Sequence, residues 1–178
     1  MQEKIQTHFR YGLFTGIAVV IAALLLHVTG LSMEKWAQYI LYIPFLIGLI
    51  LNAQAFAKAN NHRVSYGGVF SSCFKASAII TLITIAWGFL SIYIFPEMQQ
   101  KSFELAEQSM REQGTMSEEQ IEQALEVSKK FFVPFMIGSL LFFNMLLGAI
   151  FSLIAAAIPK KTGNQTPFEN TDSQQFQH

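Results

Sequence analysis

Charged side chains are scarce in this sequence, and so is cysteine. Only 13% of the 178 residues are charged, whereas 52% are apolar; a typical soluble domain has about 25% charged residues. The single cysteine, Cys73, excludes an internal disulfide framework and a cysteine-cluster metal site. The 12 basic and 12 acidic residues balance, so the excess of positive charge typical of nucleic-acid-binding proteins is absent. We therefore expect no nucleic-acid partner.

Four long apolar runs dominate what is present. Each is long enough to cross a bilayer, which takes ~20 helical residues. Lys75, at the start of the third run, is their only charged residue, and none of the runs has the polar stripe of a soluble amphipathic helix. The sequence predicts an all-α membrane protein with one domain, residues 1–160, that contains four transmembrane helices. The runs cover about residues 11–28, 36–56, 74–95 and 133–158.

The first run also needs to be distinguished from a signal peptide. It is longer than the apolar core of most signal peptides, and no small-residue cleavage site follows it at Leu26–Gly30. We expect it to be retained as a helix.

Basic residues are distributed unevenly between the two sides of the predicted helices. With four spans, both termini share one side, which carries seven basic and three acidic residues. The connector 96–130, on the opposite side, carries four basic residues and eight glutamates. Because basic residues in short loops stay in the cytoplasm, we predict both termini inside and this connector outside. Trp36, Tyr39 and Tyr93 would then lie at the outer interface, where such rings prefer to sit.

The connector 96–130 is rich in Glu, Gln, Ala, Met and Leu, which favour helix. Gly114 interrupts it, and Ser117 with Gln120 has the spacing of a capping box that starts a second helix. We predict a helical hairpin, or two short helices, outside the membrane. Its glutamates suggest a solvated face, with a cation-binding surface as the alternative. One face of its second helix is formed by Ile121, Ala124, Leu125 and Ser128.

Two other segments are polar. Between residues 57 and 73, the pairs Asn60-Asn61 and Gly67-Gly68 are typical of turns. The two glycines either permit a reversal of the chain or lie against a neighbouring helix end. The tail, residues 161–178, is rich in Gln, Asn and Thr, and we predict that it is a disordered cytoplasmic segment.

Small and weakly polar residues recur along one face of the third run. Their spacing of three or four keeps them on one side of a helix, and small residues allow membrane helices to approach closely. We predict a helix-packing seam here, with a polar path for a solute as the alternative. The first run contains a Gly-x-x-x-Gly motif at Gly12 and Gly16, which suits packing within the chain as well as dimerisation. The residues assigned to the seam are Ser77, Thr81, Thr84, Gly88, Ser91, Asn144, Gly148 and Ser152.

Strongly polar groups inside a bilayer are costly, so each needs a reason. Asn144 lies near the middle of the fourth run, and we expect it to hydrogen-bond to Thr81 or Thr84 and lock the fourth helix to the third. His27 lies near the outer end of the first run, where its ring can reach headgroups. Asn52 and Gln54 lie near the inner end of the second run, where we expect both to reach water. Pro44, in the middle of that run, should kink the helix.

The sequence lacks the motifs that indicate catalysis, metal binding or phosphate binding. The apolar runs contain no Asp or Glu, and the sequence shows no His-x-x-x-His pair, no paired nucleophile and base at a common depth, and no glycine-rich phosphate loop. We predict no catalytic, cofactor-binding or metal-binding residues and no cofactor, and we expect that the protein is not an enzyme.

Three features together resemble a known family. They are Ser-Tyr-Gly-Gly-Val-Phe at residues 65–70, Tyr-Ile-Phe-Pro at residues 93–96, and an acidic helical connector with Pro134 near the start of the fourth run. Over roughly residues 5–160, the chain is similar to the bacterial membrane-protein family catalogued as domain of unknown function 4199. The resemblance implies a multi-pass protein of the bacterial cytoplasmic (inner) membrane, with no established activity or site residue to carry over.

The sequence is compatible with two functions. The first is a structural or accessory membrane protein that associates with other membrane proteins, or with itself, through small-residue faces. The alternative is a small transporter or channel subunit with a polar path along the third helix.

Overall fold

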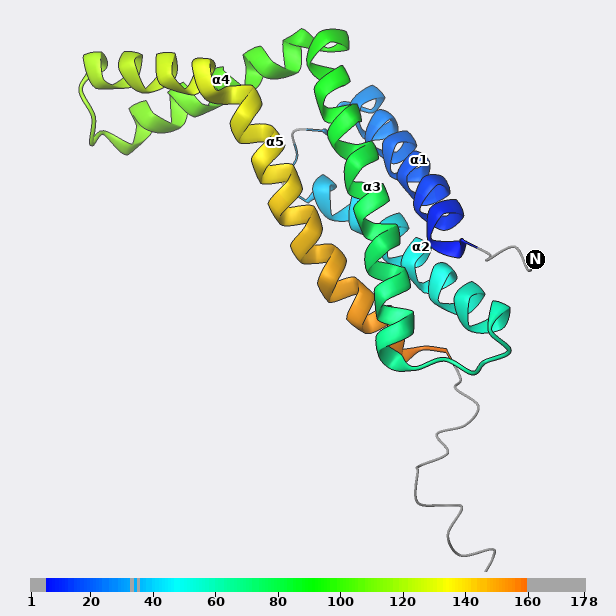
Figure 1. Cartoon of the computed structure of the whole chain (residues 1–178). Coiled ribbons are helices and arrows are strands. Elements are labelled where there is room, and N and C mark those ends of the chain that lie inside the picture. The colour runs from blue at the N-terminus through cyan, green and yellow to red at the C-terminus, as the bar shows by residue number, and fades with distance from the viewer. Residues whose placement is uncertain (1–5, 33, 35, 160–178) are drawn as a thin grey trace, which may run out of the picture.

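The protein is a bundle of four long helices with a helical arm (Figure 1). The computed structural model describes residues 6–32, 34 and 36–159, and every regular element in those ranges is a helix. The elements are α1 (Thr7–Val28), α2 (Ala37–Ala59), α3 (Tyr66–Ile94), α4 (Pro96–Gln113) and α5 (Glu118–Ala157). Four of them, α1, α2, α3 and α5, are long and apolar enough to cross a membrane. The prediction of an all-α, four-span membrane protein is confirmed, whereas the tail 161–178 lies outside the described residues.

Two helices extend further than their apolar runs. α3 begins at Tyr66 because the Ser65 hydroxyl caps it, accepting a hydrogen bond from the Gly68 backbone N–H at 3.1 Å. The glycine pair Gly67-Gly68 therefore lies in the first turn of α3 and does not form the chain reversal, which was one of the two alternatives for it. The chain reverses just before it, where Asn61 and His62 have positive φ angles. α5 is one continuous helix of 40 residues, which runs from the connector into the membrane-spanning part.

The arm, defined here as residues 96–130, consists of α4 and the first part of α5. A single residue, Phe95, separates α4 from α3, and the arm projects sideways from the bundle (Figure 1). Gly114 ends α4 in the left-handed conformation, and Ser117 and Gln120 form the predicted capping box of α5. On the face formed by Ile121, Ala124, Leu125 and Ser128, Ile121 and Leu125 are buried, whereas Ser128 is exposed. The two-helix prediction is confirmed, except that the second helix continues into the bundle.

Charged contacts join the two helices of the arm. The Arg111 guanidinium donates to Glu107 on its own helix at 2.9 Å and to Glu118 on α5. The hydrogen bond that Arg111 donates to Glu107, followed by the nearby charge of Glu118, raises the pKa of Arg111. Farther along, the rings of Phe103 and Phe132 pack edge to face with centroids 5.3 Å apart. The arm is thus held as a hairpin by contacts along its length.

Loss of the Ser117 cap should loosen the start of α5. We expect Ser117→Ala to cost about 1 kcal/mol, which is the usual value of an N-cap side chain, because the Gln120 N–H loses its acceptor. Amide hydrogen exchange over residues 118–122 should accelerate about fivefold, which corresponds to that free energy. Thr115→Ala, an exposed substitution two residues earlier, is the control, and equal exchange rates in the two variants would contradict the cap.

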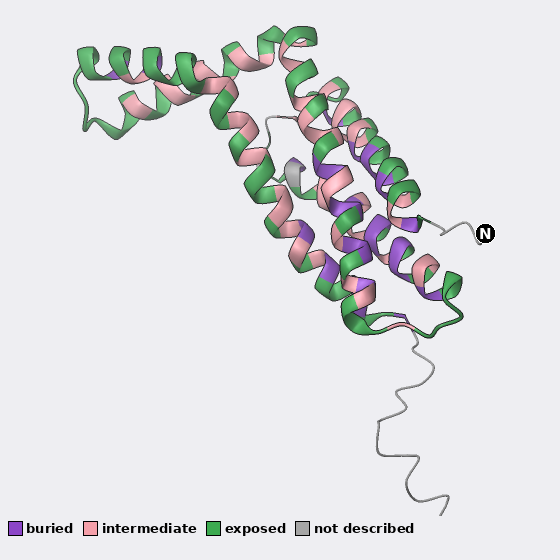
Figure 2. Ribbon diagram, viewed as in Figure 1, coloured by how far each residue is buried: buried purple, intermediate pink, exposed green. Residues whose placement is uncertain are grey.

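Buried residues concentrate at one end of the bundle. This loop end, defined here as the end where residues 60–65 connect α2 to α3, holds most of the buried positions, and the opposite arm end is more open (Figure 2). Leu49, Ala53, Val69, Cys73 and Ile80 are completely buried in its core. Large apolar side chains cover the outside of the bundle, as expected of a surface that faces lipid tails. Examples are Phe14, Phe135 and Phe142.

Candidate functional site

The predicted seam lies largely between α3 and α5. Ser77, Thr81 and Ser152 are buried, with at most 1% of each exposed. A Cβ atom added at Gly148 would lie 2.7 Å from the Ser77 Cβ, so only glycine permits this approach of the two helices. A Cβ at Gly88 would lie 3.0 Å from Leu140 of α5. The small residues at these positions therefore allow α3 and α5 to pack closely.

The hydroxyl groups that α3 contributes to the seam are bonded within α3, whereas the buried Ser152 hydroxyl of α5 has no hydrogen-bond partner among the described residues. Ser77 donates to the Phe74 carbonyl at 2.8 Å, Thr81 to the Ser77 carbonyl at 2.9 Å, and Thr84 to the Thr81 carbonyl at 2.9 Å. Ser91, which is half-buried, likewise donates to the Gly88 carbonyl at 2.8 Å. Each of these four hydroxyl protons on α3 is thus used by the helix backbone, as is common for Ser and Thr in helices.

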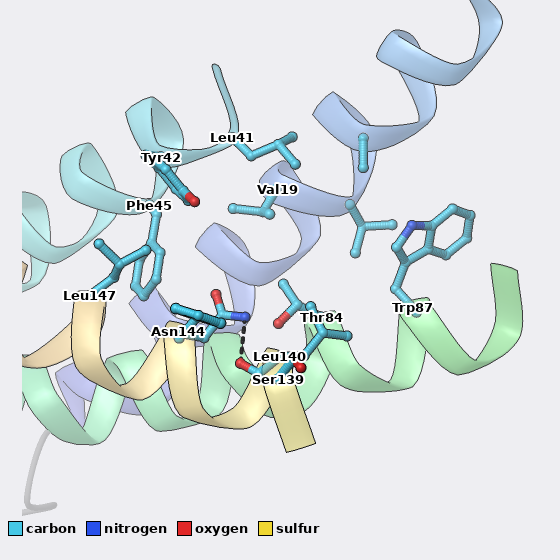
Figure 3. A pocket seen from close by; sticks show the side chains of 14 residues that line it. Val19, Leu41, Tyr42, Phe45, Thr84, Trp87, Ser139, Leu140, Asn144 and Leu147 are labelled. Carbon is cyan, nitrogen blue, oxygen red and sulfur yellow. Dashed lines mark hydrogen bonds between the residues drawn. The ribbon is translucent and has the colours of Figure 1, made fainter. Parts of the chain in front are cut away.

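The expected hydrogen bond from Asn144 to Thr81 or Thr84 was wrong. The Asn144 side-chain N–H donates instead to the carbonyl of Leu140, one turn earlier in α5, at 2.8 Å. The threonine protons are already donated to their own backbone, and the carbonyl four residues back is the nearest acceptor for Asn144. The side chain is half-buried and faces the same cavity as Thr84 (Figure 3).

Glycines also bring α1 close to its neighbours. A Cβ at Gly12 would lie 3.0 Å from the Ala76 carbonyl oxygen of α3, and one at Gly16 would lie 2.5 Å from the Ile83 Cδ1. The Gly-x-x-x-Gly motif is therefore used inside the chain. Gly48 of α2 packs against Thr15 of α1 in the same way.

Asn52, which was expected at the water boundary, forms a polar contact inside the bundle instead. The side chain is completely buried and donates to the Ser72 hydroxyl oxygen at 3.2 Å and to the Cys73 sulfur at 3.6 Å. Its carbonyl oxygen, Oδ1, has no hydrogen-bond partner among the described residues. The expectation that Asn52 reaches water was wrong, because α2 is rotated so that this side chain faces α3. Gln54, two residues later, is exposed.

His27 belongs to the junction between the bundle and the arm. Its ring packs against the Phe95 ring at a tilt of 42° with centroids 3.9 Å apart, and its Nε2 lies 3.8 Å from the Glu97 carboxylate of α4. The ring nitrogen Nδ1 is buried without a hydrogen-bond partner in the described part of the chain. The side chain therefore contacts the start of the arm. The sequence predicted only that it reaches headgroups and did not predict this contact.

A cavity of about 510 Å³ lies between α1, α2, α3 and α5, in the arm half of the bundle. All four membrane helices contribute to it, and most of its lining is aliphatic or aromatic (Figure 3). An open groove of about 700 Å³ lies beside it on α5, and Ser139 and Phe143 line both spaces. The polar or aromatic residues around the cavity are Tyr42, Phe45, Thr84, Trp87, Ser139, Phe143 and Asn144.

Comparison with protein families gives a match over residues 10–161 to the family described as "Protein of unknown function (DUF4199)". The chain belongs to this family. Searches of the curated proteins and of the solved structures give no match.

The DUF4199 chain uses its Ser-Tyr-Gly-Gly segment to fix the loop end of the bundle. Ser65 caps α3, and the hydroxyl of Tyr66 donates to the backbone carbonyl of Leu153 in α5 at 2.8 Å. The second segment of the resemblance, residues 93–96, forms the junction between α3 and α4, where Pro96 is the first residue of α4. Both segments therefore determine how helices meet.

Proposed function

We propose that this DUF4199 protein is a non-enzymatic accessory protein of a bacterial cytoplasmic membrane and that its arm is the surface that binds another membrane protein. Both termini would lie in the cytoplasm and the arm outside. The proposal is supported chiefly by the way the arm is mounted: it is a folded hairpin continuous with α5 and joined to α3 through one residue. Such an arm has a defined position relative to the bilayer, as a docking element requires.

The surface of the arm is suited to a partner with basic and apolar groups. It carries eight glutamates against four basic residues. Leu105 and Val127 are 54% and 56% exposed, on a part of the chain that lies beyond the bundle. Exposed apolar groups surrounded by charge are typical of protein-binding surfaces.

The small-residue faces are a weaker candidate for association. Gly12 and Gly16 already pack against α3, and Gly148 packs against Ser77. A partner that used these faces would have to displace a neighbouring helix. Association through the arm leaves these contacts intact.

Site-specific photo-crosslinking in native membranes tests the role of the arm. A photoreactive amino acid at Leu105 or Val127 should give a discrete band of higher mass, which identifies the partner or a second copy of this chain. The control is the same amino acid at Leu82, which is 65% exposed on the bundle and should give no discrete band. The absence of a discrete crosslinked band at both arm positions would contradict the proposal.

The transport alternative makes a different prediction about the seam. A water-filled path along α3 must reach Ser77 and Thr81, which are 0% and 1% exposed. In a Cys73→Ala background, we expect Ser77→Cys and Thr81→Cys to resist a water-soluble maleimide in opened vesicles. Ser71→Cys, exposed on the same helix, should react quickly. Rapid reaction at positions 77 and 81 would favour the transporter.

A further inference from the structure

The cavity between the four membrane helices has the dimensions of a ligand site. Its volume of about 510 Å³ lies within the usual range of roughly 300–1,000 Å³ for small-molecule pockets. Val19 and Ala23 of α1, Leu41 of α2 and Leu147 of α5 provide aliphatic surface (Figure 3). Tyr42, Phe45 and Trp87 add aromatic surface from α2 and α3. An apolar molecule with a ring would find contacts on several sides.

The cavity also contains polar atoms that the protein does not satisfy. Asn144 uses one N–H on the Leu140 carbonyl, but its second N–H and its Oδ1 form no hydrogen bond with a described residue. The Tyr42 hydroxyl and the Trp87 indole N–H likewise form no hydrogen bond within the described chain, although both residues line the cavity. Unpaired polar groups are costly at membrane depth. Both donors and acceptors are thus available to a molecule in the cavity, including a free N–H of Asn144 that can donate to a carbonyl oxygen.

The charge of the lining limits what the molecule can be. Neither the cavity nor the adjoining groove has an Asp, Glu, Lys, Arg or His residue in its lining. A charged group is expensive in an apolar environment without an opposite charge. The head of the ligand should therefore be neutral, with a carbonyl or hydroxyl oxygen to meet Tyr42, Trp87 and Asn144.

The groove on α5 supplies a place for a tail. It is lined by Phe131, Pro134, Phe135, Gly138 and Phe142 in addition to the shared Ser139 and Phe143. Phe135 is 77% exposed and Phe142 is 64% exposed, so the groove opens to the lipid that surrounds the bundle. Because Ser139 and Phe143 line both spaces, a tail in the groove can be continuous with a head in the cavity.

We propose that the cavity binds a neutral lipid-soluble molecule that has a small head with a carbonyl or hydroxyl oxygen and an apolar tail. The molecule enters from the bilayer beside Phe143, its head lies among Tyr42, Trp87 and Asn144, and its tail follows the groove on α5. This inference is independent of the proposed association through the arm.

Trp87 reports directly on occupancy of the cavity. The chain has two tryptophans, and Trp36→Phe leaves Trp87 as the only one. The purified full-length protein in phosphatidylcholine nanodiscs is titrated with decylubiquinone, which has a neutral dicarbonyl ring and an alkyl tail and quenches tryptophan on contact. We expect quenching that saturates as the quinone fills one site.

Two substitutions test where the quinone binds. Ala23→Phe fills the cavity and should raise the half-saturating concentration about tenfold, equivalent to the loss of 1.4 kcal/mol. Asn144→Leu removes the polar partner and should raise it about fivefold, as for one lost hydrogen bond. Ala18→Phe makes the same change on an exposed face of α1 and should leave binding unchanged.

The result that overturns the proposal is quenching that rises linearly with quinone in the bilayer and is equal in Ala23→Phe and Ala18→Phe. Nanodiscs made of brominated phosphatidylcholine provide a second measurement. If brominated chains quench Trp87 and Ala23→Phe relieves that quenching while the quinone does not saturate, ordinary phospholipid tails occupy the cavity and the proposed neutral head is wrong. If Ala23→Phe does not fold, the comparison of Asn144→Leu with Ala18→Phe decides between these outcomes.

Discussion

Gly48→Ala should lower the thermal stability of the protein in detergent by roughly 5 °C or more, the shift expected for about 2 kcal/mol in a chain of this length. The added Cβ would lie 2.7 Å from the Cβ of Thr15 and closer still to the oxygen of that side chain. Thr15 is buried on α1, so relief requires α1 and α2 to separate. Overpacking of this kind typically costs about 1–3 kcal/mol. Thermal unfolding followed by intrinsic fluorescence measures the effect.

The matched control is Gly138→Ala, at a glycine inside α5. A Cβ there meets no atom within 4 Å, so alanine adds no clash. The substitution should be neutral or raise the melting temperature, because alanine favours helix over glycine by up to ~1 kcal/mol. Equal destabilisation by the two substitutions would show that α1 and α2 do not meet at Gly48.

Asn52→Asp should abolish most of the folded protein, whereas Asn52→Leu should be tolerated. The side chain is completely buried and its N–H groups donate to Ser72 and Cys73. Aspartate replaces those donors by a charge without a partner, and a charged side chain in a membrane helix costs at least ~2.5–3.5 kcal/mol. Leucine removes the unpaired Oδ1 together with the donors, and replacing a buried polar group by an apolar one can be nearly neutral.

The fraction of protein that is monodisperse after extraction in mild detergent measures this difference. Gln54→Glu is the control, since it makes the same amide-to-carboxyl change at an exposed position two residues away, and it should leave that fraction unchanged. If Asn52→Asp behaves like Gln54→Glu, Asn52 does not face α3.

The number and type of the long helices could be predicted from the sequence because each apolar run is long enough to cross a bilayer as a helix. The ends of helices in the arm could be predicted as well. Gly114 and Ser117 act through their own backbone and immediate neighbours, and such local chemistry does not depend on the rest of the fold. Hydropathy alone does not mark the start of α3 at Tyr66, because its first turn, residues 66–69, contains two glycines and lies before the long apolar run.

The contacts of the polar residues could not be predicted in the same way. A soluble helix shows which face is buried through its polar stripe, but the membrane helices here are apolar all round. The sequence therefore did not indicate how far α2 and α5 are rotated about their axes. That rotation decides whether Asn52 faces water or Ser72. Asn144 does face the same cavity as Thr84, but its N–H donates to the Leu140 carbonyl of its own helix.

The cavity depends on tertiary structure alone. Its lining comes from four helices separated by up to 128 positions, from Val19 to Leu147, and no spacing within one helix indicates it. Thr84 and Asn144 were predicted to be close, and both line the cavity. Tyr42 and Trp87 were missed, because an aromatic residue near the end of a membrane helix is usually an interfacial anchor.

Labelling of single cysteines tests most directly whether the chain crosses the membrane four times with its arm outside. In a Cys73→Ala background, Ser109→Cys places a thiol on α4 and Ala59→Cys places one at the end of α2, both at exposed positions. A membrane-impermeant maleimide should label position 109 in intact spheroplasts and position 59 only after the membrane is opened. Labelling of both positions in intact spheroplasts, or of position 59 alone, would contradict this arrangement.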